Sequence, residues 1–150
     1  MPGLVLATAL PDWEWALVEA GARRAAFLER AVRELDLADR VRVRHLRAED
    51  LGRTPAERAT ADAVTARSFG PPAVTAECAA PLLRPGGVLV VSEPPDAIGD
   101  RWPPAGPALL GLRVAERRPG PPATAVLVQA APCPSRFPRR PGIPGKRPLW

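Results

Sequence analysis

The chain of 150 residues has few of the side chains from which metal centres and disulfide frameworks are built. It contains two cysteines, one histidine, one methionine and no tyrosine, and aromatic residues make up 5% of it. Cys78 and Cys133 match no metal-ligand spacing, so we expect two free thiols and no metal site. Because there is no second histidine, His45 is a poor candidate for a metal ligand or a catalytic triad.

Long apolar segments are also lacking. No apolar run approaches the roughly 20 residues that a membrane-spanning helix needs, and the N-terminus has no basic segment followed by an apolar run, as a signal peptide would have. We therefore expect a cytoplasmic protein without a membrane partner. A hydrophobic content of 46% and a charged content of 25% are typical of one globular domain.

Positive charge gathers at the C-terminus. The last 15 residues contain no acid, and their basic side chains equal the formal net charge of +5: Arg136, Arg139, Arg140, Lys146 and Arg147. Such a segment favours a polyanion such as RNA, because each neutralised phosphate releases counterions. The alternative is a terminus that only aids solubility. Six prolines from residue 131 onward predict an extended segment without regular structure.

Apolar segments and amphipathic segments alternate along the rest of the chain, which predicts an α/β fold. We expect a mostly parallel, doubly wound sheet that ends in an antiparallel hairpin. The expected strands are residues 15–19, 41–46, 61–66, 88–92, 112–117 and 123–129, and the expected helices are residues 4–10, 22–37 and 71–83. Residues 54–60 are expected to form a loop or half-turn, and residues 94–107 a loop with at most one helical turn.

Glu19 closes the apolar run at residues 15–18 and is followed by Gly21 and a helical pattern. In open α/β sheets, ligands bind at the carboxyl ends of the strands. A carboxylate there can accept hydrogen bonds from both hydroxyls of a ribose. The alternative is a solvated glutamate at a strand end, which is also common.

Several blocks resemble, in the same order, those of the ribosomal RNA small subunit methyltransferase G family, also called glucose-inhibited division protein B. They are PGL at residues 2–4, LVEA at 17–20, RRAAFLER at 23–30, RAED at 47–50, VTAR at 64–67, PLLRPGG at 81–87 and RFPRRPGIPGKRPL at 136–149. The resemblance implies a Rossmann-like class I S-adenosylmethionine-dependent methyltransferase fold. It also implies N7-methylation of one guanine in a loop of 16S rRNA, within the RNA or a small ribosomal subunit precursor.

The resemblance also implies site residues. Glu19 would bind the ribose of S-adenosyl-L-methionine, and Ala48 and Glu49 would frame its adenine. Arg67 matches an arginine at the cofactor and substrate site and is the candidate for orienting the base or a phosphate; its alternative role is a salt bridge at a sheet edge. The family's glycine-rich loop would end at Met1, Pro2 and Gly3. We expect Glu19, Glu49 and Arg67 to share one hollow.

The chain departs from the family pattern at its start. The family has a first strand and most of a glycine-rich loop ahead of the position where this sequence begins. We therefore expect a methyltransferase domain at residues 1–131 that lacks them, with two neighbouring strands left unpaired, and a basic tail at residues 132–150. A truncated gene product and a diverged paralogue both fit. We expect a monomer, unless another chain supplies the strand.

A second departure concerns the substrate. Ser92 and Glu93 stand where the family usually has a lysine followed by glycine. The alternatives are therefore a methyltransferase of the same fold acting on a small molecule or a protein, and a non-catalytic RNA-binding remnant. In the tail, Phe137 or Trp150 could stack on an RNA base or pack back on the protein.

Overall fold

The computed structural model describes residues 2–94 and 100–150, which form two compact units, one ending at Ala48 and the other beginning at Glu49. The first unit contains helix α1 (Pro2–Ala9), strand β1 (Trp15–Val18), helix α2 (Ala22–Glu34) and strand β2 (Val41–Arg44). The second contains the helices α3 (Ala48–Arg53, beginning at the last residue of the first unit), η1 (Pro55–Glu57, a 3-10 turn), α4 (Pro72–Ala79), α5 (Ala105–Ala108) and α6 (Ile143–Lys146). Its strands are β3 (Ala61–Ala66), β4 (Leu83–Ser92), β5 (Leu112–Arg118) and β6 (Thr124–Gln129).

In the first unit, β1 and β2 form a parallel pair in which Leu17 lies opposite Val43. Helix α2 is amphipathic: its buried residues Ala25, Leu28 and Val32 recur at intervals of three and four, so they share one helix face. Leu28 and Val32 pack into a small core with residues of α1 and both strands. The members of that core are Ala7, Leu17, Leu28, Val32, Leu37 and Val41.

The end of α1 is held by an arginine from another part of the first unit. The Arg40 guanidinium donates hydrogen bonds to the carbonyl oxygens of Ala7, at 2.6 Å, and of Leu10, at 3.3 Å. The last carbonyl groups of a helix lack partners within the helix, so a cation there satisfies them and opposes the helix dipole. Gly3 lies so close to β1 that a Cβ atom on it would come within 2.7 Å of Leu17 Cδ2.

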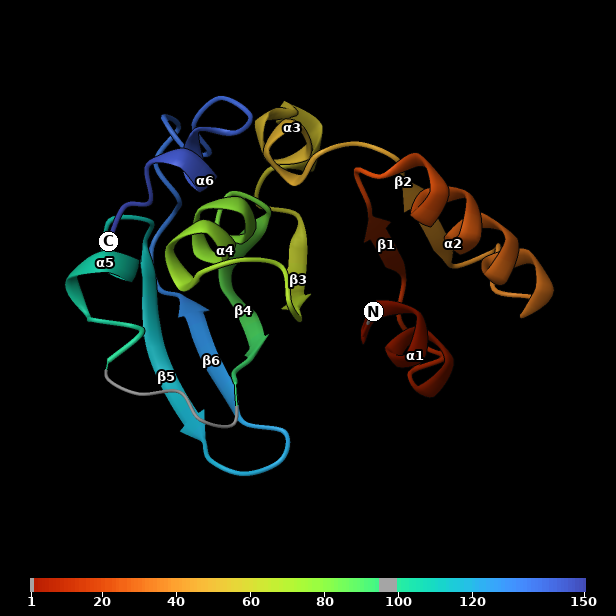
Figure 1. Ribbon diagram of the computed structural model, residues 1–150, viewed down its shortest axis with the longest axis horizontal. Coiled ribbons are helices and arrows are strands. Elements are labelled where there is room, and N and C mark those ends of the chain that lie inside the picture. Colours follow the sequence, from red (N-terminus) through yellow and green to blue (C-terminus); the bar gives the residue numbers. More distant parts are fainter. Residues whose placement is uncertain (1, 95–99) are drawn as a thin grey trace. The chain divides into compact units, whose positions relative to one another are not determined.

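In the second unit, the four strands form one sheet in the order β3-β4-β6-β5 (Figure 1). Strand β3 is parallel to β4, while β6 is antiparallel to both β4 and β5. Leu89 in β4 lies between Val64 of β3 and Leu127 of β6, at the centre of the sheet. The surrounding core consists of Ala76, Ala79, Ala80, Leu83, Leu89, Val91, Trp102, Leu110, Leu112, Ala125, Leu127 and Phe137.

The predicted alternation of strands and helices and the terminal hairpin are confirmed. The strands form two sheets, however, and among the described residues β1 and β3 each have a neighbour on one side only. The expectation that a first strand is missing and leaves two strands unpaired stays a prediction. The short helix α3 was not expected, and α4 ends at Ala79, four residues before the predicted end.

The C-terminal segment, residues 131–150, was predicted to lack regular structure. This prediction is wrong, because the segment contains the turn of helix α6. The segment packs against α4 and is held by charged side chains from other parts of the second unit. The Arg58 guanidinium donates to the carbonyl oxygen of Phe137 at 2.6 Å and to that of Gly52 at 2.7 Å. Buried prolines at 138 and 144 add apolar contacts, so tertiary packing overrides the local effect of the prolines.

Candidate functional site

Glu19 follows β1 directly, at the carboxyl end of the strand. Its Oε1 atom accepts hydrogen bonds from the backbone N–H of Gly21, at 2.7 Å, and from the Arg24 guanidinium, at 2.7 Å. These bonds, with the Arg24 contribution the largest, lower the pKa of the Glu19 carboxyl to about 2. Glu19 is therefore an ionised acceptor at neutral pH.

The two members of this ion pair differ in exposure. The Glu19 side chain is 12% exposed, whereas the Arg24 side chain is 69% exposed. An exposed arginine gains little from such a pair and can exchange with another donor at small cost. A ribose diol presents two O–H donors of the kind that an ionised carboxylate accepts, so the residues at this strand end fit the cofactor that the sequence implies.

The other residues predicted near the glycine loop lie elsewhere in the first unit. Met1 falls outside the described residues. Pro2 is the first residue of α1, and Gly3 makes the close approach to Leu17 described above. Their predicted contact with cofactor stays a prediction.

Ala48 and Glu49 are the first two residues of α3. The Glu49 side chain is buried, and its Oε1 atom accepts a hydrogen bond from the backbone N–H of Gly142 at 3.0 Å. This bond fastens the C-terminal segment to α3, a role that the sequence pattern did not reveal. Glu19 belongs to the first unit and Glu49 to the second, so the expected hollow shared with Arg67 stays a prediction.

Arg67 follows β3, at the carboxyl end of that strand. It is exposed, and among the described residues it makes no hydrogen bond or ion pair. It lines a hollow of about 330 Å³ between the ends of β3 and β4 and the start of α4. The remaining lining residues are Ala66, Ser68, Phe69, Gly70, Pro72, Thr75, Val91, Ser92, Glu93, Pro94 and Arg101.

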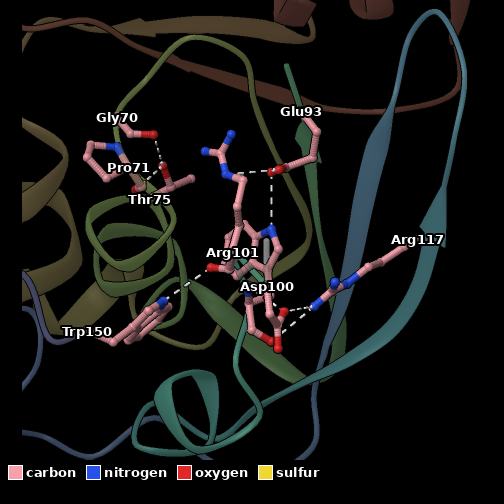
Figure 2. A network of polar contacts seen from close by, with 9 residues as sticks. Gly70, Pro71, Thr75, Glu93, Asp100, Arg101, Arg117 and Trp150 are labelled. Carbon is pink, nitrogen blue, oxygen red and sulfur yellow. Dashed lines mark hydrogen bonds and ion pairs between the residues drawn. The ribbon is translucent and has the colours of Figure 1, made fainter. Parts of the chain in front are cut away.

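Glu93, an acid in the segment where the family usually has a lysine, belongs to a polar network at this hollow (Figure 2). Its Oε1 atom accepts a hydrogen bond from the Trp102 indole N–H at 3.1 Å, and its Oε2 atom lies 3.2 Å from Nε of Arg101. Asp100 pairs with Arg117, and the Trp150 indole N–H donates to the carbonyl oxygen of Arg101 at 3.4 Å.

A second hollow, of about 270 Å³, adjoins the first, because Glu93, Pro94 and Arg101 line both. The sequence drew attention to Glu93 through its departure from the family, but Arg101 and Trp102 were missed as its partners. They lie in a segment rich in proline and glycine, where no periodic pattern shows which side chains turn inward.

The five predicted RNA-binding side chains differ in what the structure does with them. Arg139 is engaged in a bidentate ion pair with Glu77, at 2.8 and 2.6 Å, and its backbone N–H donates to the same carboxylate at 2.8 Å. Glu77 is fully buried. The other four are exposed: Arg136, Arg140, Lys146 and Arg147.

The two tail aromatic rings pack back on the protein, which was one of the two alternatives for them. Phe137 is 5% exposed and belongs to the core. Trp150 lies over Gly106 so closely that a Cβ atom there would clash with its ring, and its ring centre is 6.4 Å from that of Trp102. Neither ring is presented for stacking on a base.

Both cysteines are free thiols, as predicted. Among the described residues, no group of three potential ligands from histidine, cysteine, aspartate and glutamate could hold a metal ion. The helices within residues 2–94 and 100–150 are all too short or too polar to cross a membrane.

Known proteins resemble this chain along almost its whole length. The family model for rRNA small subunit methyltransferase G (GidB) matches residues 1–93. The Ribosomal RNA small subunit methyltransferase G of Chloroflexus aggregans is 41% identical over 156 aligned residues, which cover 99% of this chain and 65% of that protein. This chain belongs to the ribosomal RNA small subunit methyltransferase G family.

The corresponding protein of Roseiflexus sp. (strain RS-1) is 37% identical, with 99% of this chain and 66% of that protein covered. The chain thus spans just under two thirds of the length of these members of the family. Among solved structures, a 16S rRNA (adenine(1408)-N(1))-methyltransferase from Catenulisporales acidiphilia matches with a TM-score of 0.65 and 18% identity. It is matched over 89% of this chain and 81% of that one, which shows the class I methyltransferase fold.

Proposed function

We propose that this chain carries out, or forms part of, S-adenosylmethionine-dependent N7-methylation of a guanine in 16S rRNA. The observation that carries the proposal is the 41% identity with a ribosomal RNA methyltransferase along almost the whole chain. The ionised Glu19 carboxylate at the end of β1 supports it, because such an acceptor suits a ribose diol. The proposal includes a cytoplasmic location, RNA as the partner, and a methyltransferase domain at residues 1–131 followed by the basic tail.

The reaction needs little acid–base chemistry from the protein. Guanine N7 already carries the lone pair that would accept a methyl group, so no residue has to remove a proton from it. The cofactor supplies the electrophilic methyl group through its sulfonium. The residues of the chain then have to align the reacting atoms and exclude water.

Arg67 is proposed to orient the RNA at this step. It lies exposed at the end of β3 with no ionic partner among the described residues, so its charge is available to a phosphate. The N7 edge is inaccessible in an A-form helix, so the target guanine has to be unpaired and turned out. The exposed basic side chains at 136, 140, 146 and 147 would hold the flanking backbone.

Isothermal titration of the full chain with S-adenosylmethionine tests cofactor binding. Glu19→Ala is expected to weaken binding by roughly 10- to 100-fold, as expected for hydrogen bonds to a charged group. Glu29→Ala, which removes an exposed acid from α2, should leave the affinity unchanged. Absence of heat at millimolar cofactor would remove cofactor binding from the proposal for this chain.

Methyl transfer to deproteinised small-subunit RNA, followed by mass spectrometry of the nucleosides, tests the substrate. The main rival is a methyltransferase of the same fold that acts on a small molecule or a protein. The observation favouring it is that Ser92 and Glu93 stand where the family usually has a lysine, and that Glu93 lines both hollows. Transfer to substrates free of RNA, with none to RNA, would support the rival. Salt-dependent RNA binding without cofactor binding would instead support a non-catalytic remnant.

A further inference from the structure

The second unit contains four aromatic side chains, and the structure presents one of them to solvent. Trp102 is 1% exposed, Phe137 is 5% exposed, and Trp150 packs on Gly106 and Trp102. Phe69, in contrast, is 49% exposed. A single exposed hydrophobic side chain needs no explanation by itself, so its surroundings decide what it can do.

Phe69 lies two residues after Arg67, in the loop between β3 and α4, and both side chains line the hollow of about 330 Å³. The residue between them, Ser68, has a φ of 51°, in the left-handed region that residues other than glycine rarely adopt. Backbone conformations of this kind persist where the surrounding structure enforces them, and they gather at functional sites.

The far end of this loop is tied to the start of α4. The Thr75 hydroxyl lies 3.2 Å from the carbonyl oxygen of Gly70 and 3.1 Å from that of Pro71, and donates to both (Figure 2). Because its ends are fixed by β3 and by Thr75, the loop presents the Phe69 ring in a defined place. A ring held in advance loses little conformational freedom when a ligand stacks on it.

We propose that Phe69 is the stacking platform for the unpaired target base, with Arg67 bound to a phosphate of the same nucleotide. An exposed ring and a cation that line the same hollow, the cation without a partner among the described residues, are features with which proteins hold single-stranded RNA. This proposal rests on the proposed function for the identity of the base, a guanine.

Stacking also fits the chemistry better than a hydrogen bond to the reacting edge. A donor placed on N7 would occupy the lone pair that must attack the methyl carbon, whereas a ring against the base face leaves every edge of the base open. Arg67 therefore assists the reaction by binding a phosphate rather than the N7 atom of the base. Glu93 does not have to contact the base in this arrangement, because its carboxylate is already bonded to Arg101 and Trp102.

The test is a thermodynamic cycle on the full chain. Affinity is measured by fluorescence anisotropy for a labelled single-stranded oligouridylate with one central guanosine, and for the same RNA with an abasic ribose at that position. Phe69→Leu is expected to weaken binding of the guanosine RNA by about 5- to 150-fold, the range for one base–aromatic stack, and to leave binding of the abasic RNA unchanged. Phe69→Trp should restore the difference between the two RNAs.

Leu109→Ala is the matched control, because Leu109 is 45% exposed in the same unit and lines neither hollow. It should change neither affinity. Equal weakening of both RNAs by Phe69→Leu, no weakening of either, or no RNA binding by the unaltered chain would overturn the proposal. None of these measurements uses the cofactor, so the failure of cofactor binding alone would remove the proposed activity without touching the stacking result.

Discussion

In the first unit, the carboxylate of Glu19 is bonded to its own loop and to an exposed arginine five residues away. In the second unit, Glu49 and Glu77 are buried and bonded to groups 93 and 62 residues away along the chain. Their partners, Gly142 and Arg139, belong to the C-terminal segment. Glu49 and Glu77 therefore fasten the structure of the second unit, whereas the arginine partner of Glu19 is exposed, which suits the proposed binding of a ribose there.

The two units also differ in how much core supports them. The described core of the first unit contains six buried residues, and that of the second contains twelve. A two-stranded sheet is marginally stable unless other elements cover it, and the core around β1 and β2 depends on α1 and α2. The first unit should therefore open more readily, which suits a region proposed to bind a cofactor.

The largest expected effect comes from truncating the centre of each core. Leu28→Ala in α2 and Leu89→Ala in β4 remove side chains that are 1% and 0% exposed. Each should lower the free energy of unfolding of its own unit by about 2–5 kcal/mol. Urea unfolding followed by hydrogen-exchange mass spectrometry should show faster exchange in residues 2–48 for the first variant and in residues 49–150 for the second.

Leu35→Ala serves as the control for this pair, because Leu35 is 49% exposed at the end of α2. It should change stability by less than about 0.5 kcal/mol. If both core variants sped exchange equally throughout the chain, the two units would unfold as one, and the comparison would fail.

The second effect concerns the buried acid of α4. Glu77→Ala leaves the Arg139 guanidinium and backbone N–H without their acceptor, so we expect a loss of about 3 kcal/mol in the stability of the second unit. Urea denaturation with a circular dichroism readout measures it. The control is Glu116→Ala, which breaks the exposed pair with Arg118 and should produce no measurable change. An equally small effect of Glu77→Ala would show that the C-terminal segment does not depend on this pair.

Glu77 also illustrates what the sequence could and could not reveal. The strands and helices followed from apolar periodicity, because a buried face imposes a fixed spacing along the chain. The position of Glu19 was predicted from the same pattern, since the end of a strand places the acid at the edge of the sheet where ligands bind. The partners of Glu49 and Glu77 lie 62 to 93 residues away, and no local pattern encodes contacts of that separation.

The C-terminal segment was misjudged for the same reason. Its prolines and basic residues favour an extended, solvated tail, yet Pro138, Pro144 and Phe137 are buried. The Arg58 guanidinium, 79 residues away along the chain, donates a hydrogen bond to the carbonyl oxygen of Phe137. The sequence places Phe69 two residues after Arg67, which makes it a candidate for the same site. The sequence does not show, however, that Phe69 is exposed while the other three aromatic side chains of the second unit are packed.

A third, smaller effect tests the departure at residue 93. Glu93→Lys places a lysine in the segment where the family usually has one, but it removes the acceptor for the Trp102 indole and places a second cation beside Arg101. We expect a loss of about 2 kcal/mol in the stability of the second unit, and about 1 kcal/mol for Glu93→Gln, which keeps an acceptor. Thermal unfolding monitored by tryptophan fluorescence gives both values. A lysine variant as stable as the original would show that the network is dispensable.

The smallest change in stability should come from Arg24→Ala, since the pair between Arg24 and Glu19 is largely exposed on the arginine side. The substitution should have a clearer effect on the titration of the Glu19 carboxyl group. The pKa of Glu19 is lowered from the usual glutamate value of 4.5 to about 2, first of all by the hydrogen bond from Arg24. Ionised Glu19 therefore stabilises the folded chain fully at pH values above 4.5, and that contribution is lost as the pH falls through about 2.

Removing Arg24 should therefore raise the pKa of Glu19 toward its usual value, so that the carboxyl group begins to take up protons at a higher pH. Carbon-13 NMR of the labelled side-chain carboxyl follows this directly. Arg30→Ala, which affects the exposed pair with Glu34 in the same helix, is the control and should leave the Glu19 titration in place. If the pKa of Glu19 stayed near 2 without Arg24, the backbone N–H of Gly21 would be the group that holds it there. Glu19 would then be as firmly tied to its own structure as the acids of the second unit are.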